Sequence, residues 1–325
     1  MYGFSELKER IEVTEETVEC PVRGCPEVVR RRRKSDKGST DFICPVHRLD
    51  ISPSTFSYAD DRENMLWTDE SDLALFSDLK SVKRESRICA NNSEDAVSWN
   101  VFRYLERADL LGVLVEEWTG IRLVSPRIIY WSWAQEERDK DTEGDWSDLN
   151  RARREFGEVV SRGSEPDIIV IGDNAVVFIE AKVTASNETV PTRPEVEAGY
   201  VNGGNKWYET MFTRDFQTIA CDNRKYELLR FWLLGSWLAS DVGADFHLVN
   251  LVLPDRETDI ESRFGQFIVQ HDHARFSRKT WEDAWRFVAT AAPESDDRRR
   301  LLDYFENHTL GYEDGTLQRA FRVSR

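Results

Sequence analysis

One short stretch of the sequence constrains the fold more than any other. Residues 166–182 read PDIIVIGDNAVVFIEAK, two apolar runs joined by a Gly-Asp-Asn turn, which is typical of a tight β-hairpin. Asp167 precedes the first run, and Glu180 and Lys182 end the second. Charges beside so apolar a hairpin are costly unless they have partners, and a metal ion would be such a partner. In the alternative interpretation the charged ends reach solvent, and Glu180 and Lys182 form an ordinary surface pair.

The strand period predicts where these charges lie. Residues two apart in a strand share a face, so Glu180 and Lys182 point the same way. A turn at residues 173–174 would pair Asp167 directly with Glu180, and a turn at residues 172–173 would make them diagonal neighbours. Either register brings the three charges together. Opposed carboxylates repel unless a cation lies between them, and hard oxygen ligands favour Mg²⁺ or Mn²⁺.

A helix is predicted upstream of the hairpin, over residues 91–108. It opens with Asn and Ser cap candidates and acids in its first turn. Apolar residues then recur at helical spacing from Val97 to Leu105. Extending this stripe backwards reaches Glu94, with Asp95 as the competing candidate. One carboxylate of this helix is therefore expected to lie on its buried face.

The hairpin residues resemble the signature of the PD-(D/E)XK nuclease superfamily, which includes restriction, repair and phage-defence nucleases. The match consists of "PD" at residues 166–167 and "EAK" at residues 180–182, placed on a hairpin as in that family. The resemblance implies an α/β, restriction-endonuclease-like domain over residues 56–325, with a mixed central sheet flanked by helices.

Residue by residue, the resemblance implies a catalytic site. Asp167 and Glu180 would ligate a catalytic Mg²⁺ or Mn²⁺, with Glu94 as a further acidic ligand, and Lys182 would position or activate the attacking water. The implied activity is that of a metal-dependent endonuclease that leaves a 3′-hydroxyl, with DNA favoured over RNA. A role in restriction or antiphage defence is expected with it.

A second helix is predicted from the apolar run KYELLRFWLLGSWLAS, residues 225–240. In some nucleases of the family a Gln and a Tyr on the helix after the signature strand support the site. Here Tyr226 and Arg230 share one face and are accessory candidates, but no Gln stands one turn before Tyr226. Core packing is the other interpretation of Tyr226. Arg230 on an apolar face needs an acidic or phosphate partner.

Cysteine and histidine spacing predicts a second, separate site near the N-terminus. Cys20, Cys25, Cys44 and His47 form two pairs with the ligand number and types of a closed, structural zinc site. The alternative is a set of scattered cysteines without metal. A segment this short could hardly form a stable core without a bound metal ion. Residues 1–55 are therefore interpreted as a module that resembles a zinc ribbon.

The distribution of charge indicates one basic surface on an acidic chain. The formal net charge is -16, which disfavours general binding to phosphate, yet residues 21–40 hold seven basic residues against two acids. We expect a strand-turn-strand between the two ligand pairs to carry a basic run that contacts phosphates, unless this run is only a solvated face. The run comprises Arg30, Arg31, Arg32, Arg33 and Lys34.

Other features bound the function classes. No apolar run approaches the roughly 18 residues of a membrane span, and the N-terminal residues lack a secretory pattern, so a cytoplasmic protein without membrane contact is expected. The protein partners that this interpretation allows are a second copy of the chain and a defence-system protein. The competing functions are a non-catalytic zinc-ribbon module that binds nucleic acid or protein on a degenerate nuclease fold, and a metal-dependent hydrolase of another substrate.

Overall fold

The computed structural model describes residues 1–33, 36, 40–82, 87–133, 146–159, 163–193 and 196–324, which fall into two units. Unit 1 comprises Met1–Ala74, Glu85–Tyr104 and Glu282–Arg325, and unit 2 comprises Leu75–Arg84 and Leu105–Trp281. The predicted boundary near residue 55 falls inside unit 1, which joins both ends of the chain.

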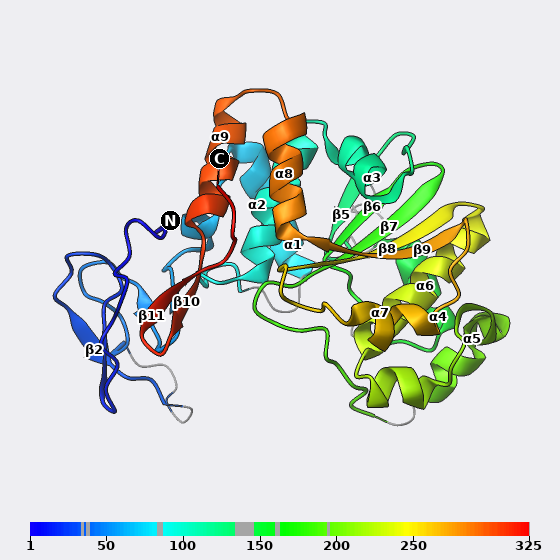
Figure 1. The fold of residues 1–325 in the computed structure, drawn as a ribbon, viewed down its shortest axis with the longest axis horizontal. Helices are drawn as coiled ribbons and strands as arrows, with labels where there is room; N and C mark the ends of the chain where they lie inside the picture. The colour runs from blue at the N-terminus through cyan, green and yellow to red at the C-terminus, as the bar shows by residue number, and fades with distance from the viewer. Residues whose placement is uncertain are drawn as a thin grey trace. The chain divides into compact units, whose positions relative to one another are not determined.

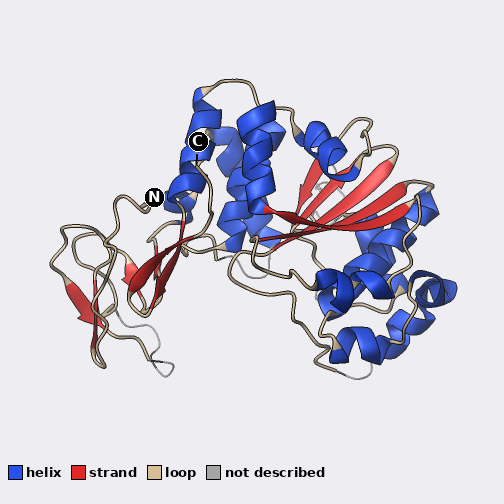
Figure 2. Cartoon of the chain, in the orientation of Figure 1, coloured by secondary structure: helices blue, strands red, loops and turns tan. Residues whose placement is uncertain are grey.

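Unit 2 is built around a five-stranded sheet in the order β5-β6-β7-β8-β9 (Figures 1 and 2). Its strands are β5 (Arg127–Tyr130), β6 (Ile168–Ile171), β7 (Ala175–Ala181), β8 (Asp245–Val252) and β9 (Ala274–Thr280). The pairs among β5, β6 and β7 are antiparallel, and β8 and β9 continue the sheet in parallel with β7. The predicted mixed central sheet is therefore confirmed.

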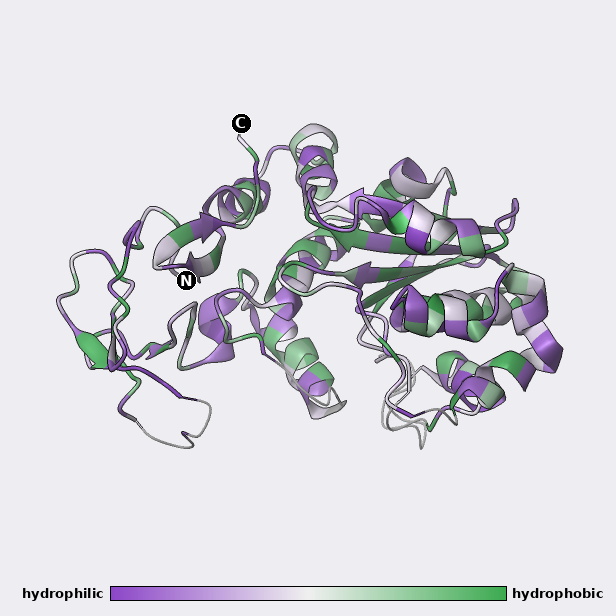
Figure 3. Ribbon diagram, turned by 60° about the horizontal axis from the view of Figure 1, so that its bottom comes forward, coloured by the Kyte–Doolittle hydropathy of each residue, from purple (hydrophilic) through white to green (hydrophobic). Residues whose placement is uncertain are grey.

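The central strands are buried on both faces. Every residue of β6 and β7 is buried, and so is β8 after its first residue. Figure 3 shows the same strands as the most continuous hydrophobic part of unit 2. Helices cover such a sheet, which is why its strands read as unbroken apolar runs rather than as alternating ones.

Several helices of unit 2 gather on one side of this sheet (Figure 1). The helices of the unit are α3 (Leu111–Thr119), α4 (Ser147–Glu155), α5 (Val196–Met211), the π-helix η4 (Gln217–Asp222), α6 (Tyr226–Val242), α7 (Ile260–Arg263) and the 3₁₀ helix η5 (Gly265–Phe267). Helix α6 confirms the predicted buried helix and packs on β7 and β8.

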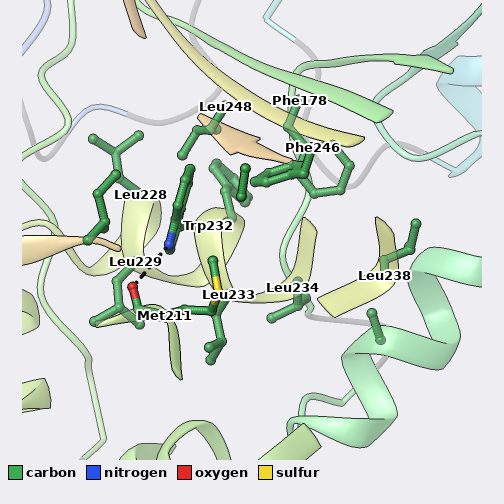
Figure 4. Close-up of a cluster of buried hydrophobic side chains, with 14 of the residues drawn as sticks. Phe178, Met211, Leu228, Leu229, Trp232, Leu233, Leu234, Leu238, Phe246 and Leu248 are labelled. Atoms are coloured by element: carbon green, nitrogen blue, oxygen red, sulfur yellow. Dashed lines mark hydrogen bonds between the residues drawn. The ribbon is translucent and has the colours of Figure 1, made fainter. Parts of the chain in front are cut away.

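Close approach of α6 to the sheet depends on a glycine. A Cβ atom at Gly235 would lie 2.2 Å from the ring of Phe246 and 3.0 Å from that of Phe178, so only glycine fits there. Trp232 fills the adjacent space, and its indole nitrogen donates a hydrogen bond to the Met211 carbonyl at 3.3 Å (Figure 4). The core thus fixes α6 against the face of the sheet that carries Phe178.

Helix α5 consists of two helical segments. Residues 203–206 leave the helical conformation, and Gly204, Asn205 and Lys206 adopt positive φ angles of 58°, 54° and 65°. A Cβ atom at Gly204 would lie 2.8 Å from the Phe156 ring, so this break also lets α5 pack closely on the end of α4.

Unit 1 holds small two-stranded sheets and helices. Its elements are β1 (Thr17–Glu19), β2 (Val28–Arg30), β3 (Asp50–Ile51), β4 (Phe56–Ser57), the 3₁₀ helix η1 (Asp61–Asn64), α9 (Asp296–Asn307), β10 (Thr309–Glu313) and β11 (Thr316–Arg319). Residues of α1 (Glu70–Val82), α2 (Glu94–Arg107) and α8 (Trp281–Ala291) belong to both units.

The two ends of the chain share one core in unit 1. Tyr312 and Leu317 of the C-terminal hairpin pack in the same apolar cluster as Leu7 and Val18. The Tyr312 hydroxyl also donates a hydrogen bond to the Lys8 carbonyl at 2.9 Å. The N-terminal module therefore completes its core with residues from the far end of the sequence.

The strand pairing inside the N-terminal module differs from the expectation. Strand β2 pairs with β1, with Thr17 opposite Arg30, rather than forming a regular hairpin with the segment that follows it. One backbone hydrogen bond joins the Arg30 amide to the Asp41 carbonyl at 3.0 Å. Proximity of β1 in the sequence made this pairing available, and the predicted turn residues mostly lie outside the described part of the chain.

In the part of the chain that the structure describes, none of the helices combines the length and the apolar character needed to cross a membrane.

Candidate functional sites

The predicted cysteine and histidine ligands converge on one point in unit 1. Cys20, Cys25, Cys44 and His47 place their ligand atoms within 4.8 Å of one another. The Cys25 and Cys44 sulfurs are 3.9 Å apart, and the Nδ1 atom of His47 lies 3.7 Å from Cys20 Sγ and 3.6 Å from Cys44 Sγ. Sulfurs bound to one tetrahedral zinc at about 2.3 Å lie about 3.8 Å apart. The cluster can therefore bind a metal such as zinc.

The electrostatics of this cluster also favour a cation. All three cysteines are buried. Burial raises the pKa of the Cys20 thiol, and the neighbouring Cys44 and Cys25 raise it further. Thiolates packed this closely need a positive charge between them, which a bound metal supplies.

The arginine run beside this cluster is partly engaged within unit 1. Arg32 forms an ion pair with Asp50 at 2.7 Å and stacks 4.7 Å from the Phe42 ring. Arg30 stacks on the same ring at 5.9 Å, whereas Arg31 donates a hydrogen bond to the Thr14 carbonyl at 2.8 Å. Strand β2 ends at Arg30, so Arg31 and Arg32 lie outside it.

The last two residues of the run, Arg33 and Lys34, have few described contacts. The Arg33 backbone amide donates a hydrogen bond to Asp36 at 2.9 Å, and Lys34 lies outside the described residues. The side chains of Arg30 and Arg32 are 52% and 41% exposed, so they stay accessible despite their partners.

The carboxylate hairpin adopts the first of the two registers considered. Ile168 pairs with Ile179 around a two-residue turn at 173–174, which places Asp167 opposite Glu180. Val176 and Phe178 pack in the α6 core, and so do Ile169 and Ile171 of β6. Because strand side chains alternate, Glu180 continues the first row and Asp167 continues the second. Both carboxylates therefore lie on the α6 face.

A lysine and a further acid complete this cluster. Lys182 forms an ion pair with Glu180, and its Nζ atom lies 3.4 Å from Oε2 of Glu227 in the first turn of α6. Asp167 accepts a hydrogen bond from the Ala181 amide at 2.9 Å. Sequence reasoning brought the first three charges together but missed Glu227, although its place in "KYELLR", directly after Tyr226, was a usable signal.

Glu180 is the most buried of these acids, with 2% of its side chain exposed. Burial raises its pKa well above the ordinary value, Asp167 and Glu227 raise it further, and Lys182 opposes the rise. Its Oε2 atom is buried and has no hydrogen-bond partner in the structure. A carboxylate in this position gains from either a proton or a cation.

Lys182 has the opposite balance. Burial works to lower its pKa, but the negative charges of Glu180, Asp167 and Glu227 outweigh burial and raise the pKa well above the ordinary value. The ammonium therefore stays charged near neutral pH. It can donate hydrogen bonds to a water or an anion, but it does not serve as a base.

An amide pair borders the carboxylates. Asn250 of β8 lies opposite Glu180, and its Oδ1 accepts a hydrogen bond from Asn187 at 2.6 Å. The Asn250 amide nitrogen is buried and has no acceptor among the described residues. Farther along, Lys225 pairs with Glu257 at 2.6 Å. The contact between the two amides holds the segment after β7 against β8, and the ion pair joins the residue before α6 to the segment after β8. The side-chain periodicity of one strand does not predict these contacts, because the partners come from distant parts of the sequence.

The other predicted site residues fall in different places. Glu94 and Asp95 open α2 in unit 1, whereas the hairpin lies in unit 2, so the role of Glu94 stays a prediction. The Tyr226 hydroxyl lies 3.3 Å from that of Tyr200, and the Arg230 guanidinium stacks 4.7 Å from the Tyr226 ring. Both accessory candidates thus lie on α6 in the region next to Glu227, where they contact each other.

Groups of three or more His, Cys, Asp or Glu side chains could hold a metal ion. Among the described residues, the cysteine and histidine cluster is the one such group, and its ligand atoms all lie within 4.8 Å of one another. The hairpin instead offers two facing carboxylates, a number that suits Mg²⁺, which keeps several waters. No protein-family model matches the chain, and comparisons with curated proteins and with solved structures find no match. Functional assignment therefore rests on the geometry of the sites.

Proposed function

We propose that the protein is a divalent-metal-dependent nuclease whose unit 2 has a restriction-endonuclease-like fold. One observation carries the proposal: Asp167 and Glu180 oppose each other across antiparallel strands, on one face of a mixed sheet, with Lys182 next in the row of Glu180. Two acids that repel each other in an otherwise apolar hairpin lower its stability. A functional role, such as metal binding, explains why both acids occur there.

The residues fit a hard divalent cation. Glu180 has a buried carboxylate oxygen without a hydrogen-bond partner in the described part of the chain, and Asp167 lies opposite it. These two side chains would hold Mg²⁺ or Mn²⁺, with Glu94 retained as a candidate further ligand. When bound, such an ion lowers the pKa of coordinated water and stabilises negative charge on a phosphate.

Lys182 would act by donating hydrogen bonds. Its ammonium stays protonated because three carboxylates surround it. Glu180 and Glu227 hold it from two directions, so it is oriented before a substrate arrives. In this arrangement Lys182 positions a water or a phosphate oxygen, and Glu227 is its positioning residue.

Nucleic acid is the proposed substrate, with DNA favoured over RNA and with restriction or antiphage defence as the setting. The exposed arginine run supports phosphate contact by the N-terminal module, for which we propose a zinc-ribbon role. The acidic chain as a whole would otherwise repel phosphate, so contact is expected to be confined to such basic surfaces.

Cleavage of labelled DNA and RNA during a Mg²⁺ titration tests the proposal. The parent should cleave only with the metal, and Asp167→Asn should lose activity while it stays folded. Asp173→Asn is the matched control, because this exposed acid sits at the turn of the same hairpin. Equal cleavage by the parent and Asp167→Asn would contradict the proposal.

One observation favours a non-catalytic alternative. Lys182 already compensates the buried Glu180 carboxylate without any metal, as a structural ion pair would. In that case Mg²⁺ should neither raise the unfolding temperature of the parent nor support cleavage. A hydrolase of another substrate would keep the stabilisation by Mg²⁺ but cleave neither DNA nor RNA.

A further inference from the structure

A cavity of about 480 Å³ opens in unit 2, beside the start of α6. Its walls come from α5 and α6, from the residues just after α4 and from the segment around Thr189. Arg230 and Tyr226 of α6 and Tyr200 of α5 line one part of it, and Val190 and Val196 supply apolar surface. The volume is that of a small-molecule site and exceeds the needs of a few ordered waters.

The Arg230 guanidinium has no protein acceptor among the residues that the structure describes. Its Nε atom is buried without a hydrogen-bond partner, and no ion pair or hydrogen bond joins the guanidinium to another residue in the described part of the chain. It stacks instead on the face of the Tyr226 ring, at 4.7 Å. The residue as a whole is half-buried. A partly desolvated guanidinium without a protein acceptor is unfavourable, so an anion that enters the cavity would stabilise it.

Glu158, the acid with the largest electrostatic effect on Arg230, does not serve as that acceptor. Glu158 Oε1 accepts hydrogen bonds from the hydroxyls of Tyr200 and Ser164, and its Oε2 accepts one from the Ser164 amide. Burial works to lower the pKa of Arg230, but Glu158, Tyr200, Tyr226 and Glu227 outweigh it, so the arginine stays charged. Glu158, which also lines the cavity, therefore sustains the charge of Arg230 but leaves its hydrogen-bonding capacity open.

Arginine geometry suits a phosphate. The planar guanidinium can donate two parallel hydrogen bonds to phosphate oxygens. Thr192 and Arg193 also line the cavity and are exposed, so a hydroxyl and a second cation are available at its rim. Val190 and Val196 offer apolar surface against which the sugar or base attached to that phosphate can pack.

The cavity adjoins the carboxylate hairpin through one turn of helix. Glu227 contacts Lys182, and Arg230 lies three residues later on α6. Side chains three apart on a helix have Cβ atoms about 5–6 Å apart. A single bound strand could therefore reach both groups.

We propose that this cavity binds a phosphate group of the nucleic-acid strand on which the hairpin acts, with Arg230 as the principal ligand. The identity of the strand rests on the proposed nuclease function, whereas recognition of phosphate by Arg230 does not. The two ideas can therefore fail separately.

Binding measured by calorimetry on the full chain, without added Mg²⁺, tests the inference. The probes are inorganic phosphate, a deoxynucleoside monophosphate, acetate and a short single-stranded oligonucleotide. Arg230→Gln should weaken binding of the monophosphate and the oligonucleotide by about 10- to 100-fold, the effect of losing charge-assisted hydrogen bonds. Arg275→Gln is the matched control, because this arginine is exposed on β9 and pairs with Asp272.

A second variant covers the case in which Arg230→Gln does not fold. Val190 is 41% exposed at the cavity, so Val190→Glu should fold and weaken the same probes by repelling them. Monophosphate binding that neither variant changes, or equal binding of acetate, would overturn the phosphate site. Loss of monophosphate binding alone, with oligonucleotide binding intact, would overturn the strand as its source. Cleavage by Asp167→Asn at the parental rate would contradict the nuclease without altering these binding results.

Discussion

Lys182, directly after β7, joins two carboxylates from different elements, Glu180 near the end of that strand and Glu227 at the start of α6, with 3.4 Å between Nζ and Glu227 Oε2. Removing one of these acids therefore leaves the lysine with another partner. This arrangement makes it feasible to separate the role of each charge by substitution.

Glu180→Gln should leave the fold at least as stable at neutral pH. Burial and Asp167 raise the pKa of Glu180, so the folded state keeps its proton at pH values where the unfolded chain has lost it. Stability therefore falls as pH rises through that window, and glutamine removes the loss. Thermal unfolding between pH 5 and 8, with and without Mg²⁺, checks this.

The same experiment tests the metal. Mg²⁺ should raise the unfolding temperature of the parent but not that of Glu180→Gln. Glu209→Gln is the control, because that side chain is 65% exposed. A lower unfolding temperature for Glu180→Gln at neutral pH would identify Glu180 as a purely structural ion-pair partner.

Lys182→Met and Glu227→Gln should act through the same ammonium group. We expect cleavage to fall about 100-fold for Lys182→Met, as when one preorganised donor is lost, and about tenfold for Glu227→Gln. The double variant should be no slower than Lys182→Met, because Glu227 has nothing left to position. Single-turnover rates at saturating Mg²⁺ measure this, and additive losses would refute the coupling.

Replacing Cys20 and Cys44 together by serine should remove the metal of unit 1. Metal analysis of the parent is expected to find about one zinc per chain, since the four ligands close one tetrahedral site. The variant should lose the zinc and become sensitive to proteolysis between residues 1 and 55. Cys221→Ser, outside the cluster, should keep both properties, and a metal-free parent with a protease-resistant module would disprove the site.

Changing the arginine run to glutamine should reduce the salt dependence of nucleic-acid binding. For each phosphate that the protein no longer neutralises, the slope of log affinity against log salt should become shallower by about one. Because Arg32 is paired with Asp50 and Arg30 lies beside acids as well, the change should be smaller than the number of charges removed. Arg286→Gln, in an exposed pair with Asp283, is the control. An unchanged slope would mark the run as a solvated face.

His247 should contribute to unfolding in acid. Burial, together with smaller effects of Lys279 and Arg275, lowers its pKa from 6.5 to about 4, so the folded state keeps the imidazole neutral. Below pH 6.5 the unfolded chain takes up a proton that the fold excludes, so stability is lost as pH falls toward 4. The loss should approach about 3 kcal/mol.

Denaturant titrations from pH 7 to 4 measure this contribution. His247→Gln should flatten the loss, since glutamine can still reach Ser277, the present hydrogen-bond partner of the histidine at 3.0 Å. The exposed His273→Gln should behave like the parent. Identical pH profiles for the parent and His247→Gln would show that other groups cause the acid unfolding.

Part of this structure could be predicted from local chemistry. The Gly-Asp-Asn turn and the alternation of the strands predict that Asp167, Glu180 and Lys182 come together in either of two registers, because both rules act within a few residues. The structure selects the register in which Asp167 lies opposite Glu180. The apolar run of α6 predicts a buried helix for the same reason. Ligand types and pairing likewise predict the cysteine and histidine cluster, whose four residues meet.

Other relationships depend on long-range packing. Strand β2 pairs with β1, and the C-terminal hairpin enters the core of the N-terminal module, neither of which any local period indicates. Contact of Glu227 with Lys182 requires α6 to dock on the sheet, and the meeting of Glu180 with Asn250 requires the parallel pairing of β7 and β8.

The sequence by itself therefore determined the carboxylate hairpin and the shared face of its charges, the buried helix α6 and the ligand set of the metal cluster. These follow from turn geometry, side-chain periodicity and ligand chemistry, which are local. Only the tertiary structure decided which groups complete the sites, namely Glu227 beside Lys182 and the cavity around Arg230. Their positions depend on how apolar surfaces from distant segments exclude water together, and no short stretch of sequence contains that information.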